Sequence, residues 1–298
     1  MISNLKKIKK IYESGENIIS YLRSNNNSNN LSEMIQISYD IQAGNYTKKA
    51  ETNPSTEKER SYSFASIINN LGDFSSILEV GVGEATSFTY LISQLKNQEV
   101  DSYGFDISFS RILYGNKFLK KTNTKNANLF LGSYFNCPIQ DNSIDIVYTI
   151  HSLEPNGGKE KEMLQELYRI SSKYLILFEP IYELSSKKGK AHMKKHGYVK
   201  NLFSTAESLG YKIIEYKLIF EGNSFTPNST GVIVIEKTNQ LQNLYSEKTP
   251  LACPITKKPL ELIRNNYFCK DSLLLYPIVD SIPCLLPENA IIATHYLD

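Results

Sequence analysis

Two short stretches carry residue types that could bind a nucleotide-like ligand. The first, Glu79-Val80-Gly81-Val82-Gly83, ends an apolar run and precedes a helix-compatible segment, residues 85–96. Glycines placed at the end of a buried strand let the backbone turn tightly and let a ligand lie against it. The second, Ser102-Tyr103-Gly104-Phe105-Asp106, is a short strand that ends in a carboxylate. At the carboxyl edge of a doubly wound sheet, such a carboxylate accepts both hydroxyls of a ribose.

The details of the glycine pattern exclude two other nucleotide loops. A P-loop ends in Gly-Lys-Ser or Gly-Lys-Thr, which is absent here, and a dinucleotide fingerprint has a third glycine where this chain has Thr86. An acidic residue followed by Gly-x-Gly resembles the first motif of the class I S-adenosylmethionine (SAM)-dependent methyltransferases. The family's third glycine is Ala85 here, which is small. The resemblance implies that Glu79 meets the methionine part of the cofactor, through water or through its amino group.

Further segments follow in the order that this family requires. A third strand (129–133), a turn with a fourth strand and its loop (142–154) and a fifth strand (175–180) follow Asp106, and Pro138 to Asp145 resembles the family's turn before the fourth strand. A helix at 203–210 and strands at 211–220 and 230–236 complete the pattern. We therefore predict an α/β fold, a Rossmann-like seven-stranded methyltransferase sheet with helices on both faces.

The resemblance also implies a set of residues that contact SAM and its product S-adenosylhomocysteine. Ser133 stands where the family has an aspartate beside the adenine, and a helix-capping role for Asp106 is compatible with its ribose role. The implied set is Tyr46, Glu79, Gly81, Val82, Gly83, Thr86, Asp106, Ile107, Ser133, Tyr134, Phe135 and Thr149.

An aromatic segment lies before the first strand. Ser38 to Tyr46 resembles the segment with which methyltransferases of the ubiquinone-methylase type fold aromatic residues over the cofactor and the reacting group. Tyr39 and Tyr46 are therefore candidates for a lid over the site. Plain packing of two tyrosines under a loop is the alternative.

His151 is the candidate for acid–base catalysis. It lies in the loop after the fourth strand, which in the family faces the reacting methyl group. With an ordinary pKa near 6.5, a histidine can take a proton from a substrate hydroxyl. Methyl transfer from a sulfonium requires little beyond positioning, so a purely structural role, in hydrogen bonding or stacking near the cofactor, stays open.

A basic segment follows the fifth strand. Six lysines lie between residues 185 and 200, together with His192 and His196. These side chains could bind an anionic substrate such as a phosphate or an acidic sugar, and a solvated basic helix is the alternative. The two histidines have a helical metal-ligand spacing, but no third ligand is near, so we predict no metal. The candidate substrate-binding residues are Tyr39, Glu183, His192, His196 and Tyr198, and the bend at 222–228 lies at the same edge.

Composition limits the location and the partners of the protein. The 298 residues include 33 Lys and Arg against 31 Asp and Glu, a formal net charge of +2, which argues against nucleic-acid binding from charge alone. Residues 1–11 lack the apolar core of a signal peptide, no run is long enough to span a membrane, and the four cysteines are expected to be reduced. We expect a cytoplasmic protein that acts on a small molecule, without a membrane or nucleic-acid partner, and a homodimer is compatible with this.

We predict three units: an N-terminal helical lid segment (1–48), a SAM-binding methyltransferase domain (49–238) and a small, mostly β C-terminal domain (239–298). The spacing of apolar residues over 1–23 favours a docking helix over a membrane-surface helix, and a polar linker follows at 24–30. A second polar linker, 238–249, precedes the C-terminal domain.

The C-terminal domain contains a recognisable cysteine pattern. Cys253-Pro254-Ile255-Thr256, Cys269 to Ser272 and Tyr276 to Leu286 resemble the small zinc-ribbon-like activator subunit of tRNA, rRNA and release-factor methyltransferases. Thr256 and Ser272 replace two of its four cysteines, so we predict that this domain folds without metal. Its apolar strands, 273–276 and 282–286, must then pack against the methyltransferase domain or a partner chain.

The expected reaction is O-methylation of a small polar metabolite such as a sugar or glycan precursor. The sequence after the fourth strand, His151-Ser152-Leu153-Glu154-Pro155, lacks the Asn-Pro-Pro-Tyr motif of amide and adenine-amino methylation, and no cysteine pair suggests a C5-pyrimidine enzyme. Methylation of tRNA or another macromolecule is one alternative, motivated by the C-terminal domain. A non-catalytic SAM-binding scaffold is the other.

Overall fold

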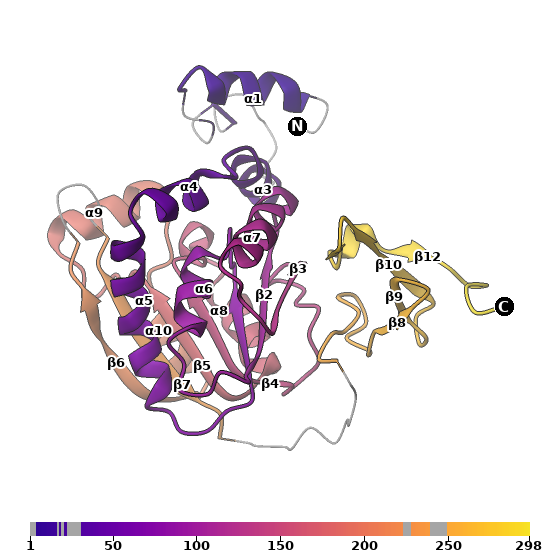
Figure 1. Cartoon of the computed structure of the whole chain (residues 1–298). Coiled ribbons are helices and arrows are strands. Elements are labelled where there is room, and N and C mark those ends of the chain that lie inside the picture. The colour runs from indigo at the N-terminus through magenta and orange to yellow at the C-terminus, as the bar shows by residue number, and fades with distance from the viewer. Residues whose placement is uncertain (1–3, 17, 19–20, 23–30, 223–227, 239–248) are drawn as a thin grey trace.

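A central sheet with helices on both faces forms the body of the protein (Figure 1). The computed structural model describes residues 4–16, 18, 21–22, 31–222, 228–238 and 249–298. The predicted linker at 24–30 and most of the bend at 222–228 and of the linker at 238–249 lie outside these residues. Within the described part of the chain, no helix combines the length and the apolar character needed to cross a membrane.

The α-helices that lie within the described residues are α1 (Leu5–Glu13), α3 (Leu31–Ile41), α4 (Asn45–Thr52), α5 (Pro54–Asn69), α6 (Thr86–Ile92), α7 (Phe109–Lys121), α8 (Glu160–Ile170), α9 (Lys187–His196) and α10 (Leu202–Ser208). The strands of the large sheet are β1 (Ser76–Val80), β2 (Asp101–Asp106), β3 (Ala127–Leu131), β4 (Ile144–Ile150), β5 (Ser171–Glu179), β6 (Lys212–Phe220) and β7 (Thr230–Glu236).

The seven strands lie in the order β3-β2-β1-β4-β5-β7-β6. Neighbouring strands from β3 to β5 are parallel, and β7 is antiparallel to both β5 and β6. The predicted Rossmann-like methyltransferase sheet is therefore confirmed. Helix α6 is shorter than expected: it ends at Ile92, after which the N–H groups of Gln94 and Leu95 donate to carbonyls three residues back instead of four.

Alternation along the strands divides the core between the two faces of the sheet. In β5, Leu175 and Leu177 pack with α8 and α10, whereas Ile176 and Phe178 pack with α5, α6 and α7. All four side chains are fully buried. Successive strand residues point to opposite faces, so a strand covered on both sides reads as the continuous apolar run seen in the sequence.

This topology brings the predicted site residues to one edge of the sheet. The parallel strands β1, β2, β4 and β5 all end there, at Val80, Asp106, Ile150 and Glu179. Strand β7 runs the other way, so it begins at this edge, with Thr230. Helices α3 and α4 lie above the same edge in Figure 1.

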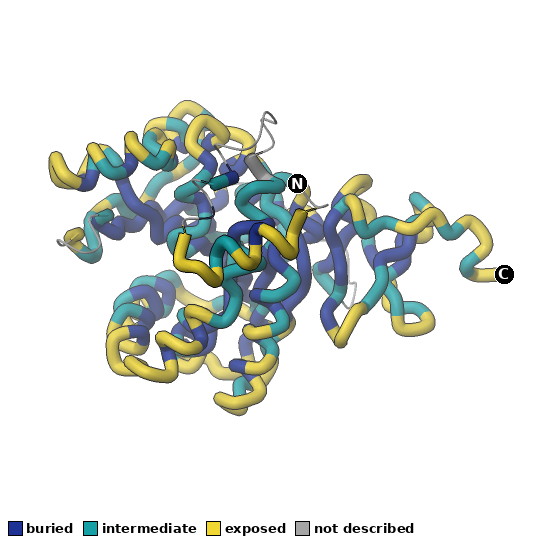
Figure 2. The backbone as a smooth tube through the Cα atoms, turned by 90° about the horizontal axis from the view of Figure 1, so that it is seen from above, coloured by how far each residue is buried: buried dark blue, intermediate teal, exposed yellow. Residues whose placement is uncertain are grey.

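The N-terminal helices stand apart from the sheet. Ile8 of α1 is only 3% exposed and packs with Ile37 of α3, as expected of a docking helix, while most of α1 is exposed (Figure 2). The proposed boundary between residues 48 and 49 falls inside α4.

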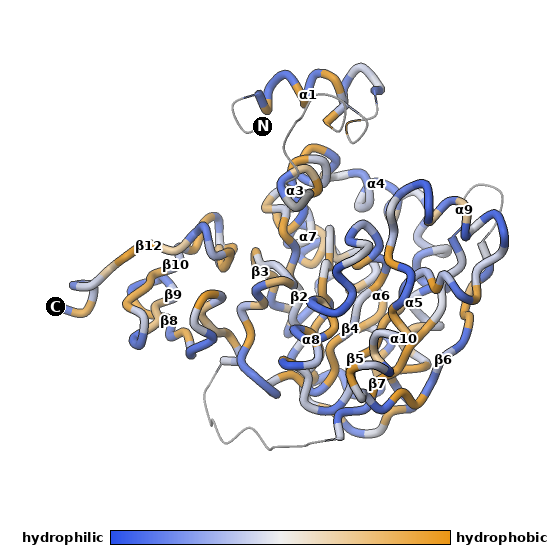
Figure 3. The backbone as a smooth tube through the Cα atoms, turned by 180° about the vertical axis from the view of Figure 1, so that it is seen from behind, coloured by the Kyte–Doolittle hydropathy of each residue, from blue (hydrophilic) through white to orange (hydrophobic). Residues whose placement is uncertain are grey.

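The C-terminal unit forms a second, antiparallel sheet in the order β11-β10-β9-β8, in which β12 also pairs with β10. Its strands are β8 (Glu261–Ile263), β9 (Asn266–Cys269), β10 (Leu274–Val279), β11 (Ile282–Pro283) and β12 (Ile291–Ile292). At its outer edge β12 shows as a hydrophobic segment in Figure 3, and Ile292 is 80% exposed.

The unit docks on the free edge of the large sheet. Cys284 forms a parallel bridge with Leu131 of β3, and the Leu285 N–H donates to the Leu131 carbonyl over 2.9 Å. A second bridge joins Ile139 to Leu251. Leu285 and Tyr276 are fully buried in the same cluster as the large sheet's core. The contact therefore covers the exposed edge of β3 and buries the apolar strands of the small unit within this chain.

Candidate functional site

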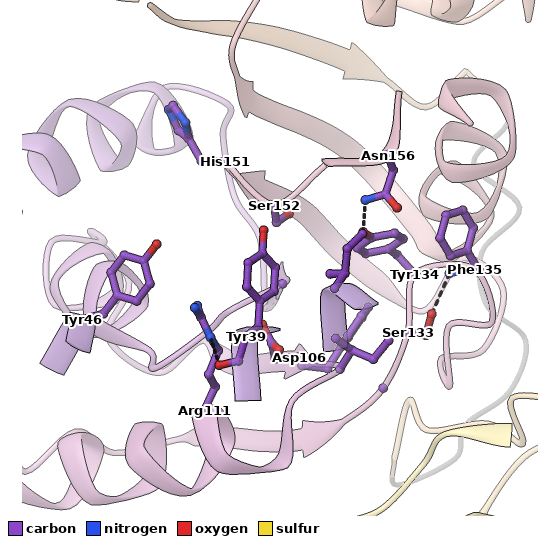
Figure 4. A pocket seen from close by; sticks show the side chains of 15 residues that line it. Tyr39, Tyr46, Asp106, Arg111, Ser133, Tyr134, Phe135, His151, Ser152 and Asn156 are labelled. Carbon is purple, nitrogen blue, oxygen red and sulfur yellow. Dashed lines mark hydrogen bonds between the residues drawn. The ribbon is translucent and has the colours of Figure 1, made fainter. Parts of the chain in front are cut away.

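A pocket opens at the edge where the parallel strands end (Figure 4). The space not filled by protein atoms there is about 700 Å³, which includes open solvent. The lining residues are Ile35, Tyr39, Tyr46, Gly81, Phe105, Asp106, Ile107, Arg111, Gly132, Ser133, Tyr134, Phe135, His151, Ser152 and Asn156.

The glycine loop is shaped by a close approach to the loop after β4. Gly81 has a φ of +71°, and its N–H donates to the Phe105 carbonyl over 2.9 Å. A Cβ placed on Gly81 would lie 2.4 Å from the Cβ of Ser152. The Ser152 hydroxyl in turn donates to the Val80 carbonyl over 2.8 Å. Glycine at position 81 is therefore required by the contact between two loops that both line the pocket.

Asp106, the residue predicted to bind the ribose, ends β2 and lines the pocket. Its side chain is buried, and its two oxygens accept from the Gly83 N–H over 3.1 Å and from the Ser108 N–H over 2.8 Å. Burial raises the pKa of the carboxyl group, and the nearby Arg111 and these N–H donors lower it. Each oxygen keeps a lone pair for a further donor. The carboxylate can therefore still accept hydrogen bonds from two hydroxyls.

The Glu79 side chain lies beneath the surface of the pocket and does not border it. It is 3% exposed, is absent from the pocket lining and accepts the Tyr148 hydroxyl over 2.7 Å. Burial raises its pKa to about 8, although the Tyr148 hydrogen bond opposes this. The group is therefore largely protonated at neutral pH, and a nearby cationic amino group would favour its ionised form.

Two carboxylates that the sequence analysis did not identify hold the helices above the pocket. Asp40, at the end of α3, accepts from the Ser110 N–H over 3.0 Å and from both the Ser108 and Ser110 hydroxyls. Glu84 accepts from the N–H groups of Gly44 and Thr47 at the start of α4, over 2.9 and 2.7 Å. Each carboxylate thus satisfies free N–H groups at a helix N-terminus.

Arg111 in the first turn of α7 was also missed, because an isolated arginine in a predicted helix reads as a surface residue. It is 6% exposed, and its Nε donates to the Tyr39 carbonyl over 3.1 Å. The guanidinium lies over the rings of Tyr39 and Tyr46, 4.6 and 4.9 Å from their centroids. Figure 4 shows the two tyrosines on either side of Arg111. The predicted lid tyrosines are therefore in contact with a buried cation.

His151 lines the pocket with both ring nitrogens engaged. The Glu154 carboxylate contacts Nδ1, and the Thr230 hydroxyl lies 2.7 Å from Nε2. The residue has a φ of +51°, an uncommon conformation for a non-glycine residue. A carboxylate can only accept, so Nδ1 carries a proton, and in the neutral ring Nε2 accepts from the Thr230 hydroxyl. The arrangement presents Nε2 as a proton acceptor.

Glu179 supports the same loop from the end of β5. One of its oxygens accepts from the N–H groups of Ser152 and Leu153, over 3.0 and 3.2 Å. Burial raises its pKa to about 7, and His151 counteracts this effect. Ser152, Asn156 and Glu179 were not predicted individually, although all three belong to or follow the predicted fourth and fifth strands.

The aromatic part of the predicted set lines the opposite wall. Tyr134 and Phe135 pack edge to face with centroids 4.9 Å apart, and Asn156 donates to the Tyr134 hydroxyl. Ser133, in the position of the family's aspartate, accepts from the Phe135 N–H over 3.3 Å. This wall can hold a flat aromatic ring such as adenine.

Several predicted residues lie outside the pocket. Among the cofactor candidates, Val82 and Thr149 are buried behind the loops, and Glu79, Gly83 and Thr86 do not line the pocket. Among the substrate candidates, Glu183 is exposed, and His192, His196 and Tyr198 form an aromatic cluster on α9 and after it. The structure therefore does not bring these four substrate candidates into the cavity, although Tyr198 lies near enough to Tyr39 to raise its pKa slightly.

The cysteine pattern of the C-terminal unit forms one cluster. Cys253 Sγ lies 3.5 Å from the Thr256 N–H nitrogen and 3.8 Å from the Ser272 hydroxyl, and Thr256 Oγ1 lies 3.9 Å from Cys269 Sγ. Two thiols and two hydroxyls thus occupy positions where a zinc ribbon has four thiolates. No group of three or more metal-binding side chains occurs among the described residues.

Two comparisons match parts of the chain: a family profile, and a group of short proteins. The profile of a family described as "Methyltransferase domain" matches residues 77–173. A UPF0434 protein of Vesicomyosocius okutanii is 50% identical over 40 residues, which are 13% of this chain and 68% of that protein. The chain spans 64% to 68% of the length of such curated relatives.

Solved structures show the same fold. The complex between the Haloferax volcanii Trm112 methyltransferase activator and the putative methyltransferase is 13% identical with a TM-score of 0.51, covering 66% of this chain and 96% of that chain. Magnesium protoporphyrin IX methyltransferase of Synechocystis with bound SAM is 11% identical with a TM-score of 0.50, covering 72% of this chain and all of that chain. At these identities the likeness concerns the fold alone.

Proposed function

We propose that this chain, a SAM-dependent methyltransferase with a stretch of 40 residues that is 50% identical to a UPF0434 protein, methylates a hydroxyl group of a small polar metabolite such as a sugar or glycan precursor. The observation that carries the proposal is the contact between His151 Nε2 and the Thr230 hydroxyl at 2.7 Å. It means that in the neutral ring this nitrogen accepts a hydrogen bond from a hydroxyl, that of the buried Thr230, which itself does not line the pocket.

The residues of the pocket fit the cofactor. The turn at Gly81 approaches the neighbouring loop too closely for any side chain, Asp106 retains lone pairs for two ribose hydroxyls, and Tyr134 and Phe135 provide an aromatic wall. When bound, SAM supplies an electrophilic methyl group on a positively charged sulfur. The chain itself must then orient an acceptor oxygen and remove its proton.

His151 would remove that proton. An acceptor hydroxyl that replaces the Thr230 hydroxyl at Nε2 donates its proton there as the oxygen forms its new bond to carbon. Glu154 at Nδ1 keeps the ring in the tautomer whose Nε2 is unprotonated, and it stabilises the imidazolium that results. Glu179 holds the loop through the N–H groups of Ser152 and Leu153.

The covering helices support a small acceptor. Asp40 and Glu84 fix α3 and α4 above the pocket, and Tyr39 and Tyr46 from these helices line it. A partly covered cavity of this kind admits a small molecule, or the projecting end of a larger one, more readily than a folded macromolecule. If His192, His196 and the lysines of α9 bind an anionic group, that group lies outside the cavity.

The test is transfer of tritiated methyl from SAM to extract fractions of the producing cell, separated into small-molecule, glycan and RNA pools. We expect label in the small-molecule or glycan pool, and the label should survive mild alkali, because methyl ethers do and methyl esters do not. His151→Gln should lower the rate by about 100-fold or more while SAM binding, measured by calorimetry, stays within about threefold. Alkali-labile label, or an unchanged rate in His151→Gln, would contradict the proposal.

A second candidate is methylation of tRNA or another macromolecule. It is favoured by the C-terminal unit, which docks along β3 and resembles an activator, and by the Haloferax structure, which is a complex of a methyltransferase activator with a putative methyltransferase. Label in the RNA pool, with a rate that falls steeply as salt rises, would establish this candidate. SAM binding without label in any pool would leave a scaffold role.

We further propose that the C-terminal unit stabilises the methyltransferase domain within the same chain. Leu285 and Tyr276 contribute to the core that β4, β5 and α8 also share, and the unit covers the edge of β3. An exposed edge strand favours aggregation, so covering it has a benefit that is independent of any substrate.

A further inference from the structure

We infer that Arg111 is the carboxylate-binding residue of the cofactor pocket, and that it receives the α-carboxylate at the methionine end of SAM. The inference rests on the SAM site and is independent of which acceptor the protein methylates. It assigns a role to a residue that no motif of the chain singles out.

The first observation is an incompletely paired buried charge. Arg111 is 6% exposed, and only its Nε has a hydrogen-bond partner, the Tyr39 carbonyl. Among the described residues, no carboxylate oxygen lies within the 4.0 Å of an ion pair from its guanidinium, and neither η nitrogen donates a hydrogen bond. A buried guanidinium is unfavourable unless an anion and hydrogen bonds compensate its lost hydration.

The second observation is that the guanidinium borders the pocket at the glycine loop. Arg111 belongs to the lining, and its Nη1 would lie 3.4 Å from a Cβ placed on Gly83. Its planar group is held between the rings of Tyr39 and Tyr46 (Figure 4). Two aromatic neighbours fix the plane and leave the η nitrogens at its edge to bind a ligand. A planar fork of this kind matches a carboxylate with two parallel hydrogen bonds.

The third observation is charge selectivity. Of the described residues that line the pocket, Arg111 is the one lysine or arginine. The acid in the described lining, Asp106, accepts from the N–H groups of Gly83 and Ser108; burial raises the pKa of its carboxyl, and Arg111 is the main influence that lowers it. SAM has a single anionic group, the α-carboxylate, at the end of the molecule remote from the adenine. The geometry therefore assigns the ribose hydroxyls to Asp106 and the α-carboxylate to Arg111.

This assignment gives the lid tyrosines a defined role. Tyr39 and Tyr46 contact the guanidinium from α3 and α4, so a carboxylate bound to Arg111 would lie directly beneath the two helices. Cofactor binding and the placement of the lid are then coupled through one side chain. The alternative source of a carboxylate is an acidic methyl acceptor, and the experiment below separates the two.

The test compares the dissociation constants of SAM and decarboxylated SAM by calorimetry, in the full chain. Decarboxylated SAM keeps the sulfonium, the amine and the adenosine and lacks only the carboxylate. We expect the wild type to bind SAM about 30-fold more tightly than decarboxylated SAM, because the carboxylate would accept a pair of charge-assisted hydrogen bonds. In Arg111→Met this preference should fall below about threefold, and in Arg111→Lys it should be intermediate, because a lysine keeps the charge without the fork.

Arg60→Met is the matched control, since Arg60 also lies over an aromatic ring, Phe220 at 6.0 Å, but does not line the pocket. It should keep the full preference. If Arg111→Met does not fold, the ratio in the wild type and in Arg111→Lys decides the question. The inference is overturned if the wild type binds SAM and decarboxylated SAM equally well, or if Arg111→Met keeps the preference for SAM. In the second case, the ligand of Arg111 would be the carboxylate of an acidic methyl acceptor. Failure of the O-methylation proposal would change none of these binding ratios.

Discussion

Replacing Gly81 by alanine should damage both the stability and the site, and Gly83 provides a matched control. Both glycines have positive φ, +71° and +56°, so an alanine at either position carries a similar backbone penalty of about 1–2 kcal/mol. They differ in what the new methyl group meets. At Gly83 the nearest atom is the flexible end of Arg111, at 3.4 Å, whereas at Gly81 it is the Ser152 Cβ, at 2.4 Å.

A separation of 2.4 Å cannot be relieved by rotating the Ser152 side chain, because its Cβ is attached to the backbone of the loop. The loop would have to move, and its hydrogen bonds from Ser152 to Val80 and Glu179 would be strained. Overpacking of this kind costs about 1–3 kcal/mol in addition to the backbone penalty. We therefore expect Gly81→Ala to destabilise the protein by about 2–5 kcal/mol and Gly83→Ala by about 1–2 kcal/mol.

The assay is urea unfolding of both variants and the wild type, with SAM affinity measured by calorimetry on each. His151 lies on the displaced loop, so Gly81→Ala should also weaken binding or methylation more than Gly83→Ala does. Equal destabilisation by the two substitutions would refute the reasoning, because the shared backbone penalty would then account for the whole effect and the contact with Ser152 for none.

Three further predictions concern other parts of the molecule. The Glu79 carboxyl has a pKa of about 8 in the folded protein against an ordinary 4.5, so the wild type loses unfolding free energy as the pH rises from 5 to 7. Glu79→Gln lacks this titration, and its unfolding free energy relative to the wild type should therefore rise by about 2–3 kcal/mol over the same range. A difference that does not change with pH in urea unfolding would contradict this. Leu285→Asp should cost about 3 kcal/mol or more in unfolding free energy because it places a charge in the buried contact with β3, while Ile292→Asp, at an 80% exposed position of the same unit, should change it by less than about 0.5 kcal/mol. Metal analysis should find well under one zinc per chain, and the double variant Thr256→Cys with Ser272→Cys should acquire zinc, because it completes four thiolates; stoichiometric zinc in the wild type would show that the hydroxyls do not prevent binding.

Local sequence was sufficient for the elements and their order. The strand from Thr230 to Glu236 has the predicted ends, because a strand buried on both faces leaves a continuous apolar run. The motif from Glu79 to Gly83 was equally readable, since the positive φ at position 81 favours glycine. The profile match to a methyltransferase domain over residues 77–173 agrees with this part.

Contacts between distant segments were not readable in the same way. Asp40 and Glu84 look like surface acids in the sequence, and only the folded chain brings them to the N-termini of α7 and α4. The basic segment around His192 was expected at the substrate mouth, whereas the structure places its histidines outside the pocket lining. Such placements depend on how helices cross the sheet edge, which local patterns do not encode.

By itself, the sequence determined the sheet, the glycine turn and the carboxylate at the end of β2, because each depends on backbone conformation and on period-two burial within a few residues. The tertiary structure alone decided that Thr230 meets His151, that Ser152 closes on Gly81, and that Arg111 enters the cofactor pocket between two tyrosines. These pairs are separated by tens of residues, and their contacts arise from the packing of whole elements against one another. The chemistry of the site therefore rests on local motifs that supply the groups and on long-range packing that fixes their protonation, orientation and charge environment.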